Sequence, residues 1–425
     1  MVKLSVYFHT LKYLKFTQVY HRILKRLVHP KVNHVLGAPA IVGGHWLTHE
    51  IYPQKFLNEN DVLFLNHKVG IHSLEDWNAE EQEKLWLYNL HYFDDLNSID
   101  SQSRTALQIY WLNRWIDENP PSEGGNGWEA YTLSLRIVNW TKAFLSGLEH
   151  NQKMLDSLAQ QADFLSQDLE KHLLGNHYFV NLKALFFVGC YFEGKEADAW
   201  LAIALKGYES ELKEQVLPDG GSFELTPMYH AIMLTDLLDL YNLFTAFPNR
   251  VPSNIVELTR KKIPKMFSWL HIMSLGDDNV SFFNDSAFNV APNNNVLREY
   301  ANNLGFPIEQ LNTPKEKLIL YDMKDSGYVS IKSAGMNLIA DLSLVGPSYI
   351  PGHAHADSLA FELSLGKSRV FVNSGTSLYG MSNERFRQRG TSAHNTVVIN
   401  DKNSSEVWSG FRVARRADIC SRIVK

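Results

Sequence analysis

The spacing of apolar residues changes once along this chain, near residue 320, and this change limits the folds that the chain can adopt. From about 82 to 305, apolar residues recur every three or four positions, as on one face of a helix. The segments "TLSLRIVNWTKAFLSGL" and "NQKMLDSLAQQADFLSQDLEKHL" carry this pattern, and breaks such as "PPSEGGNG" and "LPDGGS" separate its parts. Serial pairs of helices of this kind form a bundle, a solenoid or a closed toroid.

Beyond about 320 the segments are short, rich in β-branched residues and separated by turn residues, which predicts antiparallel strands. Alternation places Phe361, Leu363 and Leu365 on one face of such a strand. Strands are still expected close to the final "CSRIVK", so we expect an incomplete sheet domain. The five segments that we expect to form strands are "GYVSIKS", "MNLIADLSL", "LAFELSL", "SRVFVNS" and "NTVVIND".

These patterns predict an α+β chain with a helical domain followed by a sheet domain. We expect a basic and irregular N-terminal segment over 1–80, a helical domain over 81–315 and an antiparallel β domain over 316–425. The net charge of −5 excludes the basic face of a nucleic-acid-binding protein. Aromatic residues make up 12% of the chain, which suits a large core and also suits a cleft where rings stack on sugars.

The first 31 residues are basic, and they carry neither a continuous apolar core nor the small-residue cleavage site of a signal peptide. This segment is either an amphipathic helix on a membrane surface or a helix docked on the body of the protein. No run of apolar residues reaches the ~20 needed to span a membrane. We therefore expect a bacterial protein of the cytoplasm or of the inner membrane surface rather than of the periplasm.

Two motifs in the helical region combine amide, imidazole and phenol groups. In "LLGNHYFVNLKALFF", Asn176 and His177 stand at the start of an apolar helix, where they suit a helix cap or a polar site. In "LPDGGSFELTPMYH", Glu224, Tyr229 and His230 follow a glycine-rich turn. A tyrosine can act as a general acid or base when neighbouring cations lower its pKa.

The motif "GGNGWEAYTLSLRIVNW" places Trp128 and Glu129 before a helix that carries Arg136 on an apolar face. A buried arginine needs an anionic partner or solvent. The partner is either a substrate carboxylate or Glu129.

The motif "GHAHAD" places His353 and His355 two residues apart. In a strand, side chains two apart point to the same face, so the two imidazoles have the spacing of a metal site. A third histidine, His394, opens the predicted strand "NTVVIND" and is a candidate third ligand.

Taken together, these motifs resemble the heparinase II/III-type polysaccharide lyases, which are similar to some alginate lyases. The resemblance covers about 86 to 412 and includes "WLYNLHYFDDL", "GNHYFVNLKAL", "DGGSFELTPMYH", "FFNDS", "GHAHADSLAFEL" and "SAHNTVVINDKNSSEVW". It implies an N-terminal (α/α) toroid, here incomplete, followed by an antiparallel β-sandwich domain.

The resemblance also implies β-elimination at a uronic acid of an acidic polysaccharide or oligosaccharide. A base removes the proton on C5, and the glycosidic oxygen leaves C4. Amide and imidazole donors must neutralise the sugar carboxylate, which the resemblance assigns to Asn176, His177 and His353. It assigns the proton transfers to Tyr229, with Tyr379 as a second proton carrier. The substrate-binding residues that we expect are Arg136, Trp128, Glu224 and His230.

The family also binds a structural zinc ion between two histidines and an aspartate of the β domain. The matching histidines are His355 and His394, whereas the aspartate position holds Asn373. A neutral amide is a weaker zinc ligand than a carboxylate. We therefore expect weak or absent zinc, and no other cofactor.

Two functions other than that of a lyase remain open. The first is that of an altered relative that binds or processes precursors of surface polysaccharides, and the second is that of a glycoside hydrolase. A glycoside hydrolase would need two carboxylates that flank the scissile bond, and Glu224 and Asp285 are the candidates for that pair.

Overall fold

The computed structural model describes residues 4–121, 124–308 and 317–423. The chain forms two compact units. Unit 1 contains residues 1–16, 212–238 and 258–425, and unit 2 contains residues 17–211 and 239–257. The expected boundary at 315/316 lies outside the described residues. Within the described part of the chain, no helix combines the length and hydropathy that a membrane span requires.

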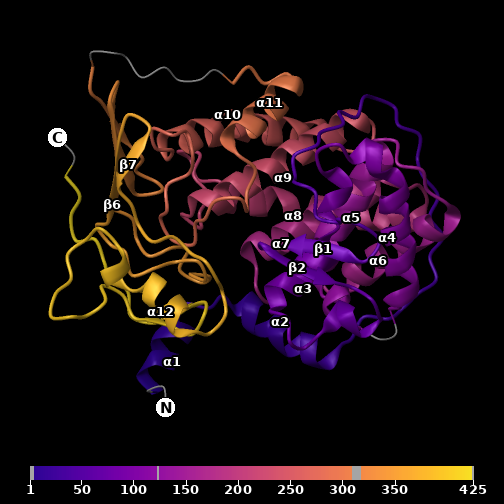
Figure 1. Ribbon diagram of the computed structural model, residues 1–425, viewed down its shortest axis with the longest axis horizontal. Helices are drawn as coiled ribbons and strands as arrows, with labels where there is room; N and C mark the ends of the chain where they lie inside the picture. Colours follow the sequence, from indigo (N-terminus) through magenta and orange to yellow (C-terminus); the bar gives the residue numbers. More distant parts are fainter. Residues whose placement is uncertain (1–3, 122–123, 309–316, 424–425) are drawn as a thin grey trace. The chain divides into compact units, whose positions relative to one another are not determined.

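Helices follow one another from Lys84 to Asn303, which confirms the helical pattern expected over about 82 to 305 (Figure 1). Four helices, α2, α8, α9 and α10, have residues in both units. The helices of the first three hundred residues are α1 (Leu4–Leu11), α2 (Phe16–Leu27), α3 (Lys84–Tyr92), α4 (Thr105–Glu118), α5 (Ala130–Leu145), α6 (Gln152–Gln167), α7 (Gly175–Tyr191), α8 (Lys195–Gln215), α9 (Pro227–Ala246), α10 (Ser253–Ile272) and α11 (Asn294–Asn303).

The core of unit 2 forms around α5, which packs against α3, α6 and α7. The apolar face expected for α5 is buried through Leu133, Ile137, Trp140 and Phe144. Several tryptophans of this unit are fully buried, so much of its aromatic content serves the core; these are Trp77, Trp111, Trp115 and Trp140.

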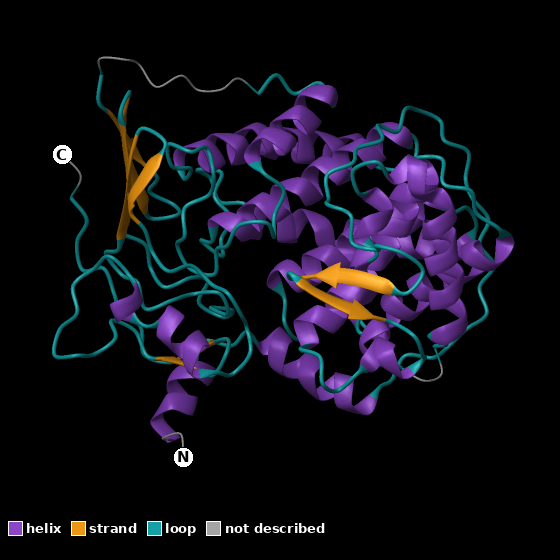
Figure 2. Ribbon diagram, in the orientation of Figure 1, coloured by secondary structure: helices purple, strands orange, loops and turns teal. Residues whose placement is uncertain are grey.

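The N-terminal segment expected to be irregular contains a β-hairpin in unit 2. Strands β1 (Asp61–Phe64) and β2 (His67–Gly70) pair antiparallel and appear among the helices of unit 2 in Figure 2. Their two-residue turn has positive φ at both Leu65 and Asn66, the geometry of a type I′ turn. Leucine rarely adopts this conformation. Because the turn sequence is Leu65-Asn66, it lacks the Asn-Gly signature that identifies such hairpins in a sequence.

Unit 1 contains a five-stranded antiparallel sheet in the order β3-β4-β5-β6-β7. The expected order, a helical region followed by an antiparallel sheet, is therefore confirmed (Figure 2). The remaining elements are β3 (Ile319–Asp322), β4 (Tyr328–Ser333), β5 (Met336–Asp341), β6 (Phe361–Leu365), β7 (Ser368–Phe371), α12 (Asn383–Arg389), β8 (Val407–Trp408) and β9 (Arg412–Val413).

One expected strand does not form. The segment 395–401 has only an isolated bridge, between Ile399 and Lys402. The side chains of Val397 and Ile399 are 77% and 69% exposed. Residues with high β propensity form a strand when a neighbouring strand and a packed face receive them. Asn395 hydrogen-bonds with Phe361 at the start of β6, but no strand of the described residues pairs with the residues that follow it.

The face of β6 that is buried is the polar one. Glu362 and Ser364 are fully buried, whereas Leu365 is exposed. The Ser364 hydroxyl accepts a hydrogen bond from the Gly276 amide at 2.9 Å, and Glu362 accepts one from the Phe282 amide at 3.1 Å. The sheet therefore uses polar side chains to fix the backbone between residues 276 and 282.

Lys332, on β4, also binds backbone groups of the segment that faces the sheet. The Lys332 ammonium donates to the carbonyl oxygens of His271 and Ser274 at 2.6 and 2.9 Å. The His271 carbonyl lies in the last turn of α10, where helical carbonyls lack partners within the helix and a cation is favourable, and Ser274 follows two residues after the helix. Burial lowers the pKa of Lys332 to about 8.

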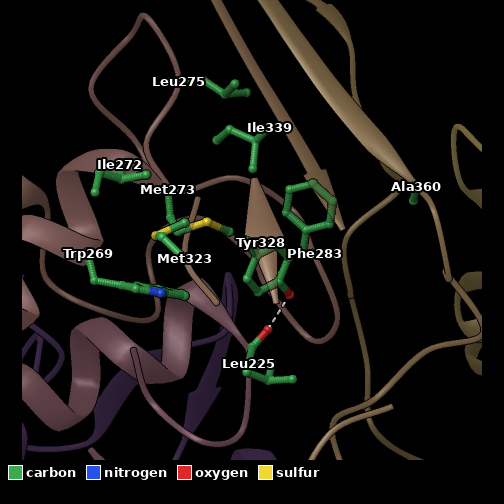
Figure 3. Close-up of a cluster of buried hydrophobic side chains, with 10 residues drawn as sticks. All are labelled: Leu225, Trp269, Ile272, Met273, Leu275, Phe283, Met323, Tyr328, Ile339 and Ala360. Carbon is green, nitrogen blue, oxygen red and sulfur yellow. Dashed lines mark hydrogen bonds between the residues drawn. The ribbon is translucent and has the colours of Figure 1, made fainter. Parts of the chain in front are cut away.

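The apolar core of unit 1 surrounds Tyr328 (Figure 3). The Tyr328 hydroxyl donates to the Leu225 carbonyl at 2.7 Å, and the Asn284 amide donates to the same oxygen at 2.8 Å. Leu225 has φ of 56°, so its backbone is held in a conformation that leucine disfavours. The cluster comprises Leu225, Trp269, Ile272, Met273, Leu275, Phe283, Met323, Tyr328, Ile339 and Ala360.

We predict that Tyr328→Phe lowers the free energy of unfolding by about 1 to 2 kcal/mol, because it removes a buried hydrogen bond while the ring stays in place. Tyr321→Phe, at the half-buried edge of the same cluster, serves as the matched control and should change stability by less than about 0.5 kcal/mol. Urea unfolding curves measure both. Equal effects of the two changes would contradict this role for the Tyr328 hydroxyl.

Candidate active site

A buried carboxylate, Asp285, is the centre of a polar cluster that lies entirely within unit 1. Arg385, on α12, binds both of its oxygens, with 2.7 Å between Nη2 and Oδ2. His353 Nδ1 lies 3.0 Å from Oδ2, and His355 Nε2 lies 2.8 Å from Oδ1. Three segments that are far apart in the sequence therefore meet at one side chain.

These contacts determine the protonation of the cluster. Burial alone would raise the pKa of Asp285, but hydrogen bonds from His353, His355 and Arg385 outweigh it and hold the pKa well below its usual range. An ionised carboxylate only accepts hydrogen bonds. His353 therefore carries a proton on Nδ1, which leaves Nε2 as the acceptor when the ring is neutral.

Tyr229 lies against His353. Pro227 begins α9, a position that suits proline, and places Tyr229 in the first helical turn. The Tyr229 and His353 rings stack with 3.9 Å between their centroids, and the Tyr229 hydroxyl donates to the Tyr379 hydroxyl at 3.1 Å. Two phenol groups and one imidazole thus form a site that can exchange protons.

Tyr379 also lies beside a cation. The Arg385 guanidinium is 5.2 Å from the centre of the Tyr379 ring. The Phe411 ring stacks on the Tyr379 ring, with 5.8 Å between the two centroids. A nearby positive charge favours a phenolate. Glu224 is buried near the same histidine, with 3.8 Å between its Oε2 and His353 Nε2, which is beyond hydrogen-bonding distance.

The two histidines of the "GHAHAD" motif do not lie in a strand. Residues 351–360 form turns, which corrects the expectation that strand alternation aligns the two rings. The rings reach the same carboxylate because Asn284 Oδ1 accepts the His355 amide at 3.0 Å and the Asp285 amide donates to the His353 carbonyl at 3.1 Å.

His230 is buried, which corrects its expected contact with substrate. Its Nδ1 accepts a hydrogen bond from the Ser222 amide at 3.1 Å, so its proton lies on Nε2, which donates to the Met266 carbonyl at 2.9 Å. The ring packs 4.3 Å from Trp269. His230 therefore holds the glycine-rich turn in place, and burial lowers its pKa to about 4.

Arg136 and Trp128 are also buried, in unit 2, which corrects the prediction that they line a cleft. The Arg136 guanidinium donates to the Gln161 side chain and to the carbonyls of His91 and Gly127, and it stacks 3.8 Å from the Trp115 ring. Its donors serve the fold, and its partner is neither Glu129 nor a substrate. The Trp128 indole nitrogen donates to the Asn119 carbonyl at 3.0 Å.

Asn176 and His177 lie in the first turn of α7, as expected, within unit 2. The helix cap is Leu174, so Asn176 does not cap the helix. His177 Nδ1 lies 3.1 Å from Glu170 Oε1, and the ring packs 4.6 Å from Tyr131. Burial alone would raise the pKa of Glu170, but His177 and a hydrogen bond from Asn181 lower it.

Weak or absent zinc binding at His355, Asn373 and His394 stays a prediction. The two imidazole rings are close, with 5.2 Å between centroids. The Asn373 side-chain oxygen, its only metal-binding atom, already accepts a hydrogen bond from the Asn395 amide at 3.2 Å. Across residues 4–121, 124–308 and 317–423, no group of three His, Cys, Asp or Glu residues could hold a metal.

Four residues of these clusters were not predicted from the sequence as part of a lyase site: Asp285, Arg385, Glu170 and Phe411. The sequence offers Asp285 as a hydrolase acid, and the residue stands in the "FFNDS" motif. Arg385 lies 100 residues from Asp285 in the sequence, and no local pattern links the two.

We predict that Asn373→Asp restores a third zinc ligand, because a carboxylate supplies the anionic oxygen that zinc prefers. Elemental analysis after dialysis should find about one zinc ion per chain in the variant and markedly less in the wild type. Wild-type protein that retains zinc as firmly as the variant would show that the amide suffices.

The depressed pKa of His230 predicts a pH-dependent stability. The unfolded imidazole titrates near 6.5 and the folded one near 4, so its contribution is complete above pH 6.5 and is lost as the pH falls to 4. This loss amounts to about 3 kcal/mol. His230→Gln should be less stable than the wild type at neutral pH but lose less stability on acidification, as measured by urea unfolding. Parallel pH profiles would contradict the prediction.

Comparisons with known proteins agree with these motifs. The family described as heparinase II/III N-terminus matches residues 43–310, and the heparinase II/III-like C-terminal family matches residues 317–424. The heparin-sulfate lyase of Bacteroides stercoris is 27% identical over 394 residues, which cover 78% of this chain and 56% of that protein. The heparin-sulfate lyase of Bacteroides thetaiotaomicron is 27% identical over 348 residues, which cover 70% of this chain and 48% of that protein.

The fold is also shared with a solved structure. The crystal structure of heparinase III is 22% identical and has a TM-score of 0.62, with 81% of this chain and 58% of that chain covered. This chain spans about half the length of the curated relatives that it matches. Because the N-terminal family alone covers more than half of the sequence, the chain belongs to the heparinase II/III family.

Proposed function

We propose that this protein is a polysaccharide lyase that cleaves an acidic, uronic-acid-containing glycan by β-elimination. The observation that carries the proposal is the contact of Tyr229 with both His353 and Tyr379, where three proton-exchanging groups meet. The relatives named heparin-sulfate lyases support the same class of substrate.

The two tyrosines divide the proton transfers. The Tyr229 oxygen, as a phenolate, takes the proton from C5 of the uronic acid, and the electrons of the C5–H bond form the C4–C5 double bond. The C4–O bond breaks, and the leaving oxygen takes a proton from Tyr379. The proton now on Tyr229 returns to Tyr379 across the 3.1 Å contact, which restores the starting state.

Charge stabilisation is assigned to groups around this pair. The Arg385 guanidinium, beside the Tyr379 ring, favours the transient phenolate. His353 is fixed by Asp285 and presents Nε2 away from that carboxylate. An imidazole in this place can orient a phenol or a sugar hydroxyl.

Asn176 and His177 are proposed to neutralise the sugar carboxylate, as the family resemblance implies. The side chain of His177 is 35% exposed, and Glu170 lies 3.1 Å from its Nδ1. A neighbouring carboxylate favours a positively charged imidazole, which is the form that binds a carboxylate. Their approach to Tyr229 and His353 stays a prediction.

We predict that Tyr229→Phe lowers kcat by about 10²- to 10⁴-fold, because only the proton-transferring oxygen is lost. Tyr110→Phe, on the surface of α4, is the matched control and should retain full activity. The assay follows the ultraviolet absorbance of unsaturated products on a panel of uronic-acid glycans that includes heparan sulfate. Glycan binding by Tyr229→Phe should match the wild type.

Undiminished elimination by Tyr229→Phe would place the base elsewhere, with His177 the next candidate. No elimination by the wild-type chain on any acidic glycan would instead favour a relative that binds or processes surface-polysaccharide precursors. The Asn373 position, which departs from the family's zinc site, is the observation that keeps this second function open.

A further inference from the structure

The N-terminal region differs in charge from the rest of the chain. Residues 1–49 contain seven Lys or Arg residues and no Asp or Glu. The whole chain has a net charge of −5, so residues 50–425 carry −12, which is −5 less +7. A negatively charged surface therefore attracts residues 1–49 and repels residues 50–425.

Helix α2 packs on unit 2 through its polar face. Gln18 is buried, and its side-chain amide donates to the Leu173 carbonyl at 3.1 Å. Lys25 lies 2.7 Å from Asp168 Oδ2. Polar contacts thus hold the side of the helix that an ordinary surface helix turns to water.

The opposite face of α2 is apolar and exposed. Val19, Tyr20, Ile23 and Leu27 follow one another at intervals of one, three and four residues, which places them on one stripe of the helix. Their exposed fractions range from 43% to 72%. The amphipathic helix is therefore turned with its apolar side outward.

Helix α1, within unit 1, repeats this arrangement. Its Thr10 hydroxyl accepts a hydrogen bond from the Trp408 indole at 3.0 Å. The outer stripe of α1 is formed by Leu4, Phe8 and Leu11, and each is at least 56% exposed. Figure 1 shows α1 at the outer edge of unit 1. Two short helices thus present apolar stripes within a region that has no acidic residue.

We propose that α2, and separately α1 within its own unit, each dock on an anionic lipid surface. The stripes supply the apolar side chains that enter the boundary between headgroups and acyl chains, and the basic residues supply attraction to the anionic headgroups. Arg26 is exposed on α2 next to its apolar stripe and is placed to meet a headgroup.

Charge complementarity favours a lipid surface over other occupants. An acidic polysaccharide would satisfy the basic residues but has no apolar interior to receive Ile23 and Leu27. A second copy of this chain would meet the same seven positive charges, which repel one another. Only a lipid surface that is both anionic and apolar uses both features.

The test is sedimentation of the full chain with vesicles of phosphatidylcholine, with and without phosphatidylglycerol. We expect binding to the anionic vesicles that weakens with salt. Ile23→Glu combined with Leu27→Glu should weaken it by about tenfold for each side chain. Thr17→Glu, an exposed position on α2 outside the apolar stripe, adds the same type of charge and is the matched control, with a much smaller effect.

Three results would overturn the proposal. One is equal binding to neutral and anionic vesicles, and another is equal loss in the stripe and control variants. The third is a wild-type chain that does not bind vesicles but forms a dimer in light scattering, with the dimer lost in the stripe variant. That result would identify a second copy of the chain as the occupant. Since both changed positions are exposed, circular dichroism should show that the variants fold normally.

Discussion

The structure of unit 1 depends on the ion pair between Asp285 and Arg385, which is completely buried. A buried charge that loses its partner costs about 3 to 5 kcal/mol, so neither residue can be replaced alone without penalty. The pair joins the loop before Asp285 to α12, and the same carboxylate orients His353 and His355. One carboxylate therefore serves both the fold and the candidate site.

The sheet serves the same purpose from the other side. Its buried face carries Lys332, Glu362 and Ser364, which bind backbone groups between His271 and Phe282. An apolar face would have left those backbone groups without partners in a buried position, at a cost. Burial raises the pKa of Glu362 to about 7 despite two backbone hydrogen bonds to its carboxylate. Polar residues in the sheet thus hold the backbone segment that leads to Asp285.

Local patterns account for the parts of the fold that sequence analysis predicted. The helical repeat identified α5 and α6 because their buried faces follow directly from the spacing of apolar residues. The strand expected at 395–401 was misjudged, because strand pairing depends on neighbours that are distant in sequence.

The candidate site divides in the same way. Tyr229 and His353 were identified from motifs, and both lie in one cluster. Arg136 was misjudged because its partners are two backbone carbonyls, which leave no trace in a sequence, and the side chain of Gln161, which is 25 residues away. Arg385 escaped notice because its partner stands 100 residues away.

The central claim is that Asp285 fixes the orientation and the tautomer of His353. A histidine-selective nitrogen NMR spectrum tests it most directly, with the His353 signals assigned through a His353→Gln variant. The account predicts that Nδ1 carries a proton, because the ionised Asp285 accepts a hydrogen bond from Nδ1. A proton on Nε2 with none on Nδ1 would contradict the account.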